Sequence, residues 1–138
     1  MRFLMLVKST TCDQGAPQDE TFLTAMDKYN EDLMKAGALV ELSGLHPSSA
    51  GARVKLSKGL VTVTDGPFPE TKELIGGFWL IEVKSKEEAV EWAKRAPMPA
   101  GRQVEIEVRQ IYDVGEFVPR RAVEKARGEG KKLAARKT

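Results

Sequence analysis

Residues 64–83 constrain the fold of this 138-residue chain most strongly, because a turn signal and two prolines run directly into an apolar segment. Asp65 and Gly66 form the turn signal, since a carboxylate can accept backbone N–H groups and glycine can adopt a positive φ. The two prolines fix their own φ and favour extended conformations at the residues before them. The sequence therefore predicts a stiff turn that holds Phe68 in one direction and leads into a strand.

The periodicity of the remaining residues places strands and helices along the chain. It predicts strands at residues 2–7, 38–43, 75–83 and 104–109, and helices at 17–36 and after Ser85, which forms a capping box with Glu88. A hairpin of residues 53–56 and 60–64 is predicted around Gly59. Without this inserted hairpin, the order strand, helix, strand, strand, helix, strand predicts an α+β, ferredoxin-like βαββαβ fold.

Two of the predicted strands need cover on both faces. The strands at residues 2–7 and 75–83 carry large apolar side chains in both alternating sets. Two helices can cover only one face of a four-stranded sheet. We therefore expect a homodimer in which a second subunit covers the other face.

Composition and charge narrow the class of protein. With 41% hydrophobic and 30% charged residues, the chain is typical of a soluble protein, and we expect one domain at residues 1–118. This part has 14 Lys or Arg against 18 Asp or Glu, whereas residues 119–138 have 8 against 2 and form a basic tail or helix. An acidic body argues against direct nucleic-acid binding.

Other classes are disfavoured by what the sequence lacks. A single cysteine, Cys12, allows no intrachain disulfide and predicts a reducing compartment, and no apolar run approaches membrane-spanning length. We expect a cytoplasmic protein without membrane association. One histidine and one cysteine cannot build a typical zinc site, although a carboxylate-held Mg²⁺ stays open. There is no phosphate-binding glycine loop, so we predict no cofactor.

The stiff turn also carries a resemblance to a known family. Together with segments upstream and downstream, it is similar to the signature of the DGPF-domain proteins, a branch of the YCII-related family. The matching segments are residues 44–47, 65–68, 70–73, 76–78, 87–89, 91–93 and 105–109. The resemblance covers about residues 1–117. It implies a dimeric α/β barrel, in which two sheets pack face to face and leave pockets. It also implies a connection with sigma-factor-dependent transcription.

His46 and Asp65 are the candidate catalytic residues. Histidine is the side chain best suited to proton transfer near neutral pH, and a carboxylate can orient its imidazole. The resemblance implies a His and an Asp in one pocket, with Asp65 at the motif position and His46 in the Gly-Leu-His-Pro pattern of one DGPF branch. The alternatives are an exposed loop histidine and an aspartate that only braces its turn.

Further residues are candidates for substrate binding. Arg53 could hold an anionic group with its planar guanidinium, while Gly76 and Gly77 could leave room beside a ligand or a neighbouring backbone. The charged residues after the turn could bind a polar substrate or form a solvated, salt-bridged rim. The complete predicted set is Arg53, Phe68, Glu70, Lys72, Glu73, Gly76, Gly77 and Phe78. Cys12 is a weak candidate nucleophile, because no flanking cation or second histidine would lower its pKa.

Two functions remain open at this point. The first is a small cofactor-independent enzyme of the lyase, isomerase or hydrolase kind that uses His46 and Asp65 on a polar or aromatic small molecule. The second is a non-catalytic dimer that binds a small ligand or a regulatory partner. The sequence does not name a substrate.

Overall fold

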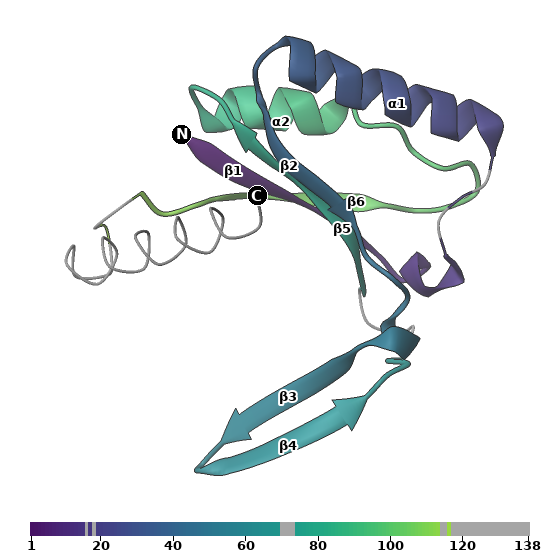
Figure 1. The fold of residues 1–138 in the computed structure, drawn as a ribbon, viewed down its shortest axis with the longest axis vertical. Coiled ribbons are helices and arrows are strands. Elements are labelled where there is room, and N and C mark those ends of the chain that lie inside the picture. The colour runs from purple at the N-terminus through teal and green to yellow at the C-terminus, as the bar shows by residue number, and fades with distance from the viewer. Residues whose placement is uncertain (16, 18, 70–73, 114–115, 117–138) are drawn as a thin grey trace, which may run out of the picture.

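The structure is a computed structural model that describes residues 1–113, except 16, 18 and 70–73, together with residue 116. Its body is an antiparallel four-stranded sheet in the order β2-β5-β1-β6, formed by Leu39–Gly44, Leu74–Glu82, Arg2–Ser9 and Glu105–Gln110. Helices α1 (Glu20–Lys35) and α2 (Lys86–Lys94) lie on one face of this sheet (Figure 1). The chain therefore has the predicted α+β class and the ferredoxin-like order of strands.

The core lies between this sheet and the two helices. Alternate residues of β1 and β5 face the helices, and Met5 and Ile81 have no exposed surface there. Leu33 on α1 and Ala89 on α2 are equally buried. The helical period of 3.6 residues and the strand period of two residues predict these side chains on the buried faces. Burial of apolar side chains therefore holds the body together.

Both helices begin at side-chain caps. The Asp19 carboxylate accepts the Thr21 N–H at 3.4 Å, so α1 begins at Glu20 and not at residue 17 as predicted. The predicted cap of α2 is confirmed: Ser85 accepts the N–H of Glu88 at 3.1 Å, although the return bond of Glu88 goes to the residue before the cap. The Glu88 carboxylate reaches back to the N–H of Lys84 at 2.9 Å. A side-chain cap three residues before Phe22 thus sets where α1 begins, a boundary that the apolar period alone does not fix.

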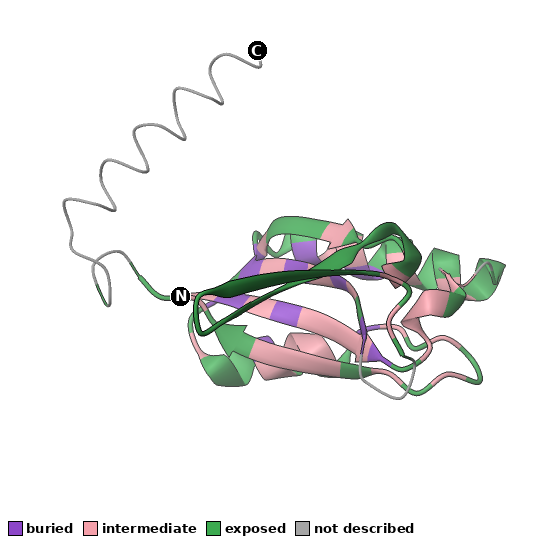
Figure 2. Cartoon of the chain, turned by 90° about the horizontal axis from the view of Figure 1, so that it is seen from below, coloured by how far each residue is buried: buried purple, intermediate pink, exposed green. Residues whose placement is uncertain are grey.

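The hairpin forms a separate two-stranded sheet of β3 (Ala52–Ser57) and β4 (Leu60–Asp65). Lys58 and Gly59 have positive φ values of 49° and 79°, which confirms the predicted turn. The hairpin extends from the body on the side of the sheet opposite the helices, and every residue of both strands is exposed (Figures 1 and 2).

The second face of the main sheet carries a half-buried apolar patch. It comprises Leu4, Leu6, Phe78 and Leu80, which cross-strand pairing places side by side. The structure is of a single chain, so the predicted homodimer and barrel stay predictions. The predicted basic tail at 119–138 lies outside the described residues. Neither described helix has the length and apolar character needed to cross a membrane.

Candidate functional site

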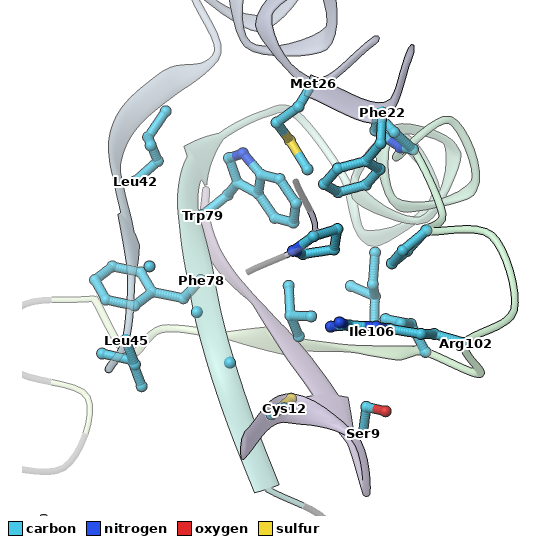
Figure 3. Close-up of a pocket in the computed structure, with 18 of the residues that line it drawn as sticks. Ser9, Cys12, Phe22, Met26, Leu42, Leu45, Phe78, Trp79, Arg102 and Ile106 are labelled. Atoms are coloured by element: carbon cyan, nitrogen blue, oxygen red, sulfur yellow. The ribbon is translucent and has the colours of Figure 1, made fainter. Parts of the chain in front are cut away.

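The body contains a cavity of about 350 Å³ at the end of the sheet where the loop after β1 and the loop before β6 meet α1. Figure 3 shows this region. Its walls come from five parts of the chain: Val7, Ser9, Thr11, Cys12, Gly15 and Pro17; Phe22, Leu23, Met26 and Asn30; Leu42 to Leu45; Gly76 to Trp79; and Pro97, Pro99, Arg102, Val104 and Ile106.

The apolar end of the cavity is formed by Phe22, Met26 and Trp79 (Figure 3). The indole N–H of Trp79 donates to the Asn30 side chain at 2.8 Å. Tyr29 packs edge-on against the same indole, with ring centroids 5.4 Å apart. Because a hydrogen bond and an aromatic contact both hold the indole, this wall is rigid before any ligand arrives.

Tyr29 is itself anchored beneath that wall. Its hydroxyl donates to the carbonyl of Trp92 at 2.6 Å, and its ring meets the Trp92 ring edge-on at 6.1 Å. Burial raises the pKa of Tyr29 to about 12. The phenol therefore stays neutral at physiological pH and supports Trp79 without contributing charge.

The opposite end of the cavity is polar. Arg102 donates from Nη1 to the carbonyl of Gly15 at 2.8 Å, and the Ser9 hydroxyl donates to the carbonyl of Gln103 at 2.7 Å. These two bonds fasten the loop before β6 to the end of β1 and to the loop that follows β1. The Ser9 hydroxyl has one proton, and it donates that proton to Gln103. Ser9 therefore accepts hydrogen bonds from the Thr11 hydroxyl at 2.8 Å and from the Thr11 N–H at 3.1 Å. The polar end is thus held by a closed set of hydrogen bonds.

Cys12 lies beside this polar end (Figure 3). Its thiol donates to the carbonyl of Leu74 at 3.3 Å, and burial raises its pKa. A thiolate is the reactive form of cysteine, so a raised pKa disfavours a nucleophilic role. This agrees with the low weight that the sequence gave to Cys12.

Gly76 and Gly77 line the cavity, and each has a close neighbour. A Cβ on Gly77 would lie 2.7 Å from the carbonyl oxygen of Ser43 on β2, and one on Gly76 would lie 2.9 Å from the Cys12 sulfur. Gly77 therefore allows close approach of a neighbouring backbone, which was one of the two predicted roles. Phe78 also lines the cavity region, but Figure 3 shows it on the opposite side of β5 from Trp79.

The stiff turn is braced by residues that the sequence did not single out. The Phe68 N–H donates to the Ser48 hydroxyl at 2.9 Å, and the Gly66 N–H donates to the carbonyl of Gly51 at 2.9 Å. Asp65 was expected to accept such N–H groups, and that expectation is wrong for these two. Asp65 lies exposed at the end of β4, paired with Ala52.

Ser48 is in turn held by Asp13. The Ser48 N–H donates to the Asp13 carboxylate at 2.7 Å, and the Ser48 hydroxyl donates to its second oxygen. These bonds lower the pKa of Asp13, because they stabilise its charged form. We call this chain of hydrogen bonds, Asp13 to Ser48 to Phe68, the bracket. It ties the root of the hairpin to the loop after β1.

The predicted catalytic residues lie near the root of the hairpin. His46 is exposed in the loop after β2, and neither it nor Asp65 is among the described residues that line the cavity. The Arg53 guanidinium lies over the Phe68 ring at 3.9 Å from the ring centroid, so these two predicted binding residues contact each other. Glu70, Lys72 and Glu73 lie outside the described residues. The pairing of His46 with Asp65 stays a prediction.

Sequence reasoning missed Trp79, Met26 and Arg102 as cavity residues. In the sequence, Trp79 and Met26 belong to apolar stripes, and residues of the packed core follow the same pattern. Arg102 lies in a Pro- and Gly-containing loop, and its contact, Gly15, is 87 positions away. Within the described part of the chain, no three metal-ligating side chains come together to hold a metal ion.

Two comparisons with known proteins place the chain in context. Residues 1–115 match the YCII-related domain. An uncharacterized protein of Rhizobium meliloti (strain 1021) is 32% identical over 112 residues, which covers 80% of this chain and 90% of that protein.

Proposed function

The chain belongs to the YCII-related family, and we propose that it binds a small, largely apolar acid, such as an aromatic carboxylate, in the cavity that ends at Arg102. The observation that carries this proposal is the charge of the lining. Arg102 is the one charged side chain among the described lining residues, and the remainder are mostly apolar. An apolar pocket with a few convergent polar groups is typical of small-molecule sites.

The apolar end suits a flat, apolar ligand group. Trp79 and Phe22 offer aromatic surface, and Met26 offers a flexible thioether that adapts to the ligand's shape. A volume of about 350 Å³ lies in the range of small-molecule sites and favours a compact ligand. Because Asn30 and Tyr29 already hold the Trp79 indole, a ligand stacking there loses little affinity to side-chain ordering.

The polar end suits an anionic group. A guanidinium has five N–H donors in a planar fork that matches a carboxylate. Within the described residues the Arg102 guanidinium donates to the Gly15 carbonyl. This hydrogen bond uses one of the donors and leaves others for a ligand. A charge-assisted hydrogen bond in a partly enclosed site is stronger than a neutral one. The ligand's acid group would therefore point towards Arg102 and its apolar part towards Trp79.

The lining favours binding over acid–base catalysis. No histidine, aspartate or glutamate is among the described lining residues, and the Cys12 thiol has a raised pKa. The alternative, an enzyme that uses His46 and Asp65, is tested once a ligand is known. Turnover that is lost in both His46→Ala and Asp65→Asn, with the fold intact, would support the enzyme and overturn simple binding.

Calorimetric titration with a matched pair of ligands tests the proposal. Indole-3-acetate and indole-3-acetamide have nearly the same shape, and only the first is an anion. We expect Arg102→Gln to weaken binding of the acid by roughly 10- to 100-fold, since a hydrogen bond to a charged group contributes about 1.5–3 kcal/mol. Binding of the amide should change by less than about threefold.

The amide also separates charge recognition from structural damage. Arg102→Gln removes the bond to Gly15 as well, and a loosened loop would weaken both ligands equally. Arg109→Gln is the matched control, because Arg109 is exposed on β6 and pairs with Glu107. Equal affinity of the wild-type protein for acid and amide, or no binding of any apolar acid from a panel of sizes, would contradict the proposal.

A further inference from the structure

The hairpin has one apolar face and one polar face. Cross-strand pairing sets Val54 opposite Val63 and Leu56 opposite Val61, so these four side chains share one face. They are exposed by 59%, 62%, 77% and 66% respectively. The other face carries Arg53, Lys55, Ser57, Leu60, Thr62 and Thr64. Such a two-sided pattern is typical of a hairpin with one face buried.

Nothing in the described part of the single chain covers this apolar face. Every residue of β3 and β4 is exposed, and a lone two-stranded hairpin is marginally stable in water. The bracket and the Gly66 to Gly51 hydrogen bond hold the root of the hairpin, but they lie at one end of it. The apolar face therefore needs a partner surface.

The position of the hairpin indicates which partner. It lies on the side of the main sheet opposite the helices, the side that carries the half-buried patch of Leu4, Leu6, Phe78 and Leu80 (Figures 1 and 2). A molecule that packed on this sheet face would come within reach of the hairpin. A second copy of the chain brings both the sheet patch and a hairpin of its own.

We propose that the apolar face of the hairpin packs on a second copy of this chain, so that two copies clasp each other about a twofold axis. In such a contact each copy both gives and receives a hairpin, because the same surfaces meet on both subunits. This proposal is independent of the ligand in the cavity. It adds the hairpin to the sheet-to-sheet contact that the strand pattern predicts.

The area of the contact supports a second copy as the occupant. Strand spacings of about 4.8 Å and a rise of about 3.3 Å per residue give the open sheet face roughly 400 Å² and one hairpin face roughly 200 Å². A stable interface buries about 800 Å² from each partner. The sheet face alone is too small. Each copy also buries one face of its own hairpin and an equal area beneath the partner's hairpin, and the three areas together reach that size.

Charge is also complementary. Residues 52–65 contain 3 Lys or Arg against 1 Asp, whereas the rest of residues 1–118 contains 11 against 17. A basic hairpin on an acidic body is attracted to the body of another copy, which raises the rate of association.

Two leucines of the hairpin make a matched test. Leu56 on the apolar face and Leu60 on the polar face are 77% and 72% exposed, so in a single chain they are nearly equivalent. Sedimentation velocity of the full chain over a range of concentrations should show a dimer for the wild-type protein. We expect Leu56→Lys to raise the dimer dissociation constant at least about tenfold, since each substitution occurs twice, and Leu60→Lys to change it less than about twofold.

Near-UV circular dichroism of the tryptophans checks that each variant keeps its folded body, and Leu56→Ser repeats the test with a smaller change. A wild-type protein that stays monomeric at high micromolar concentration would overturn the proposal. Equal effects of Leu56→Lys and Leu60→Lys, or no effect of either, would do the same. So would a wild-type monomer that binds phosphatidylcholine vesicles through Leu56, which would assign the apolar face to a lipid surface.

Discussion

The body and the hairpin are both antiparallel β structures with apolar faces, but in the single chain only the body covers one of them with its own helices. In the body, Met5 and Ile81 are completely buried under the helices. In the hairpin, Val54 and Leu56 have the same chemistry and are 59% and 77% exposed. The alternation of residues sets which face is apolar, and what covers that face depends on the rest of the assembly.

This difference also separates two roles. The cavity is built from the body: the described lining residues come from residues 7–45 and 76–106 and include none from 52–65. The hairpin has an uncovered apolar face and a basic polar face, which suit a protein partner. We therefore expect changes in the cavity to affect ligand binding and changes on the hairpin to affect assembly.

The largest expected effect is on the free energy of unfolding, which a substitution in the body should lower much more than one in the hairpin. Ile81→Ala should lower the free energy of unfolding by about 2–5 kcal/mol, because it leaves a hole in a packed core. Leu56→Ala should change it by less than about 0.5 kcal/mol in the monomer, because its side chain is already in water. Urea unfolding at a concentration that keeps the chain monomeric measures both. Similar losses for the two variants would mean that the hairpin packs within its own chain.

The next effect concerns the two glycines of β5. Gly77→Ala should destabilise by about 1–3 kcal/mol, because its Cβ would meet the Ser43 carbonyl oxygen and a strand backbone would have to move. Gly76→Ala should cost less, because a thiol can rotate away. Thermal unfolding of both variants, with Cys12→Ala added to Gly76→Ala as the control, measures the difference. A Gly76→Ala cost that Cys12→Ala does not relieve would contradict the placement of the thiol.

The elements that the sequence predicted depend on nearby residues. The hairpin turn at Gly59, the cap at Ser85 and the alternation in β5 follow from periods and turn signals within a few positions. The bracket and the Arg102 to Gly15 bond join residues 35 and 87 positions apart, and no local pattern encodes such a meeting. The polar end of the cavity could therefore be assembled only from the fold.

The smallest expected effect concerns the bracket, which joins the two regions. Asp13 has a lowered pKa in the folded chain, so its contribution to stability is present at neutral pH and is lost as the pH falls below its ordinary value of 3.8 and through the folded pKa. Asp13→Asn should speed hydrogen exchange of the Ser48 and Phe68 amides at neutral pH and remove this acid dependence.

Exchange rates are compared with the intrinsic rate at each pH, and Asp27→Asn on the exposed face of α1 is the control. Unchanged protection of Phe68 in Asp13→Asn would show that Ser48 is held without the carboxylate.

The most direct test of the division between body and hairpin is a ¹H–¹⁵N spectrum of the full chain titrated with indole-3-acetate. The indole N–H of Trp79 is a natural reporter, since it hydrogen-bonds Asn30 in the cavity wall, and Trp92 provides an internal comparison. We predict ligand-dependent shifts at Ser9, Thr11, Trp79 and Arg102, with residues 52–65 unchanged. Shifts centred on His46, Asp65 and the hairpin, with an unchanged Trp79 indole signal, would contradict ligand binding in the cavity of the body.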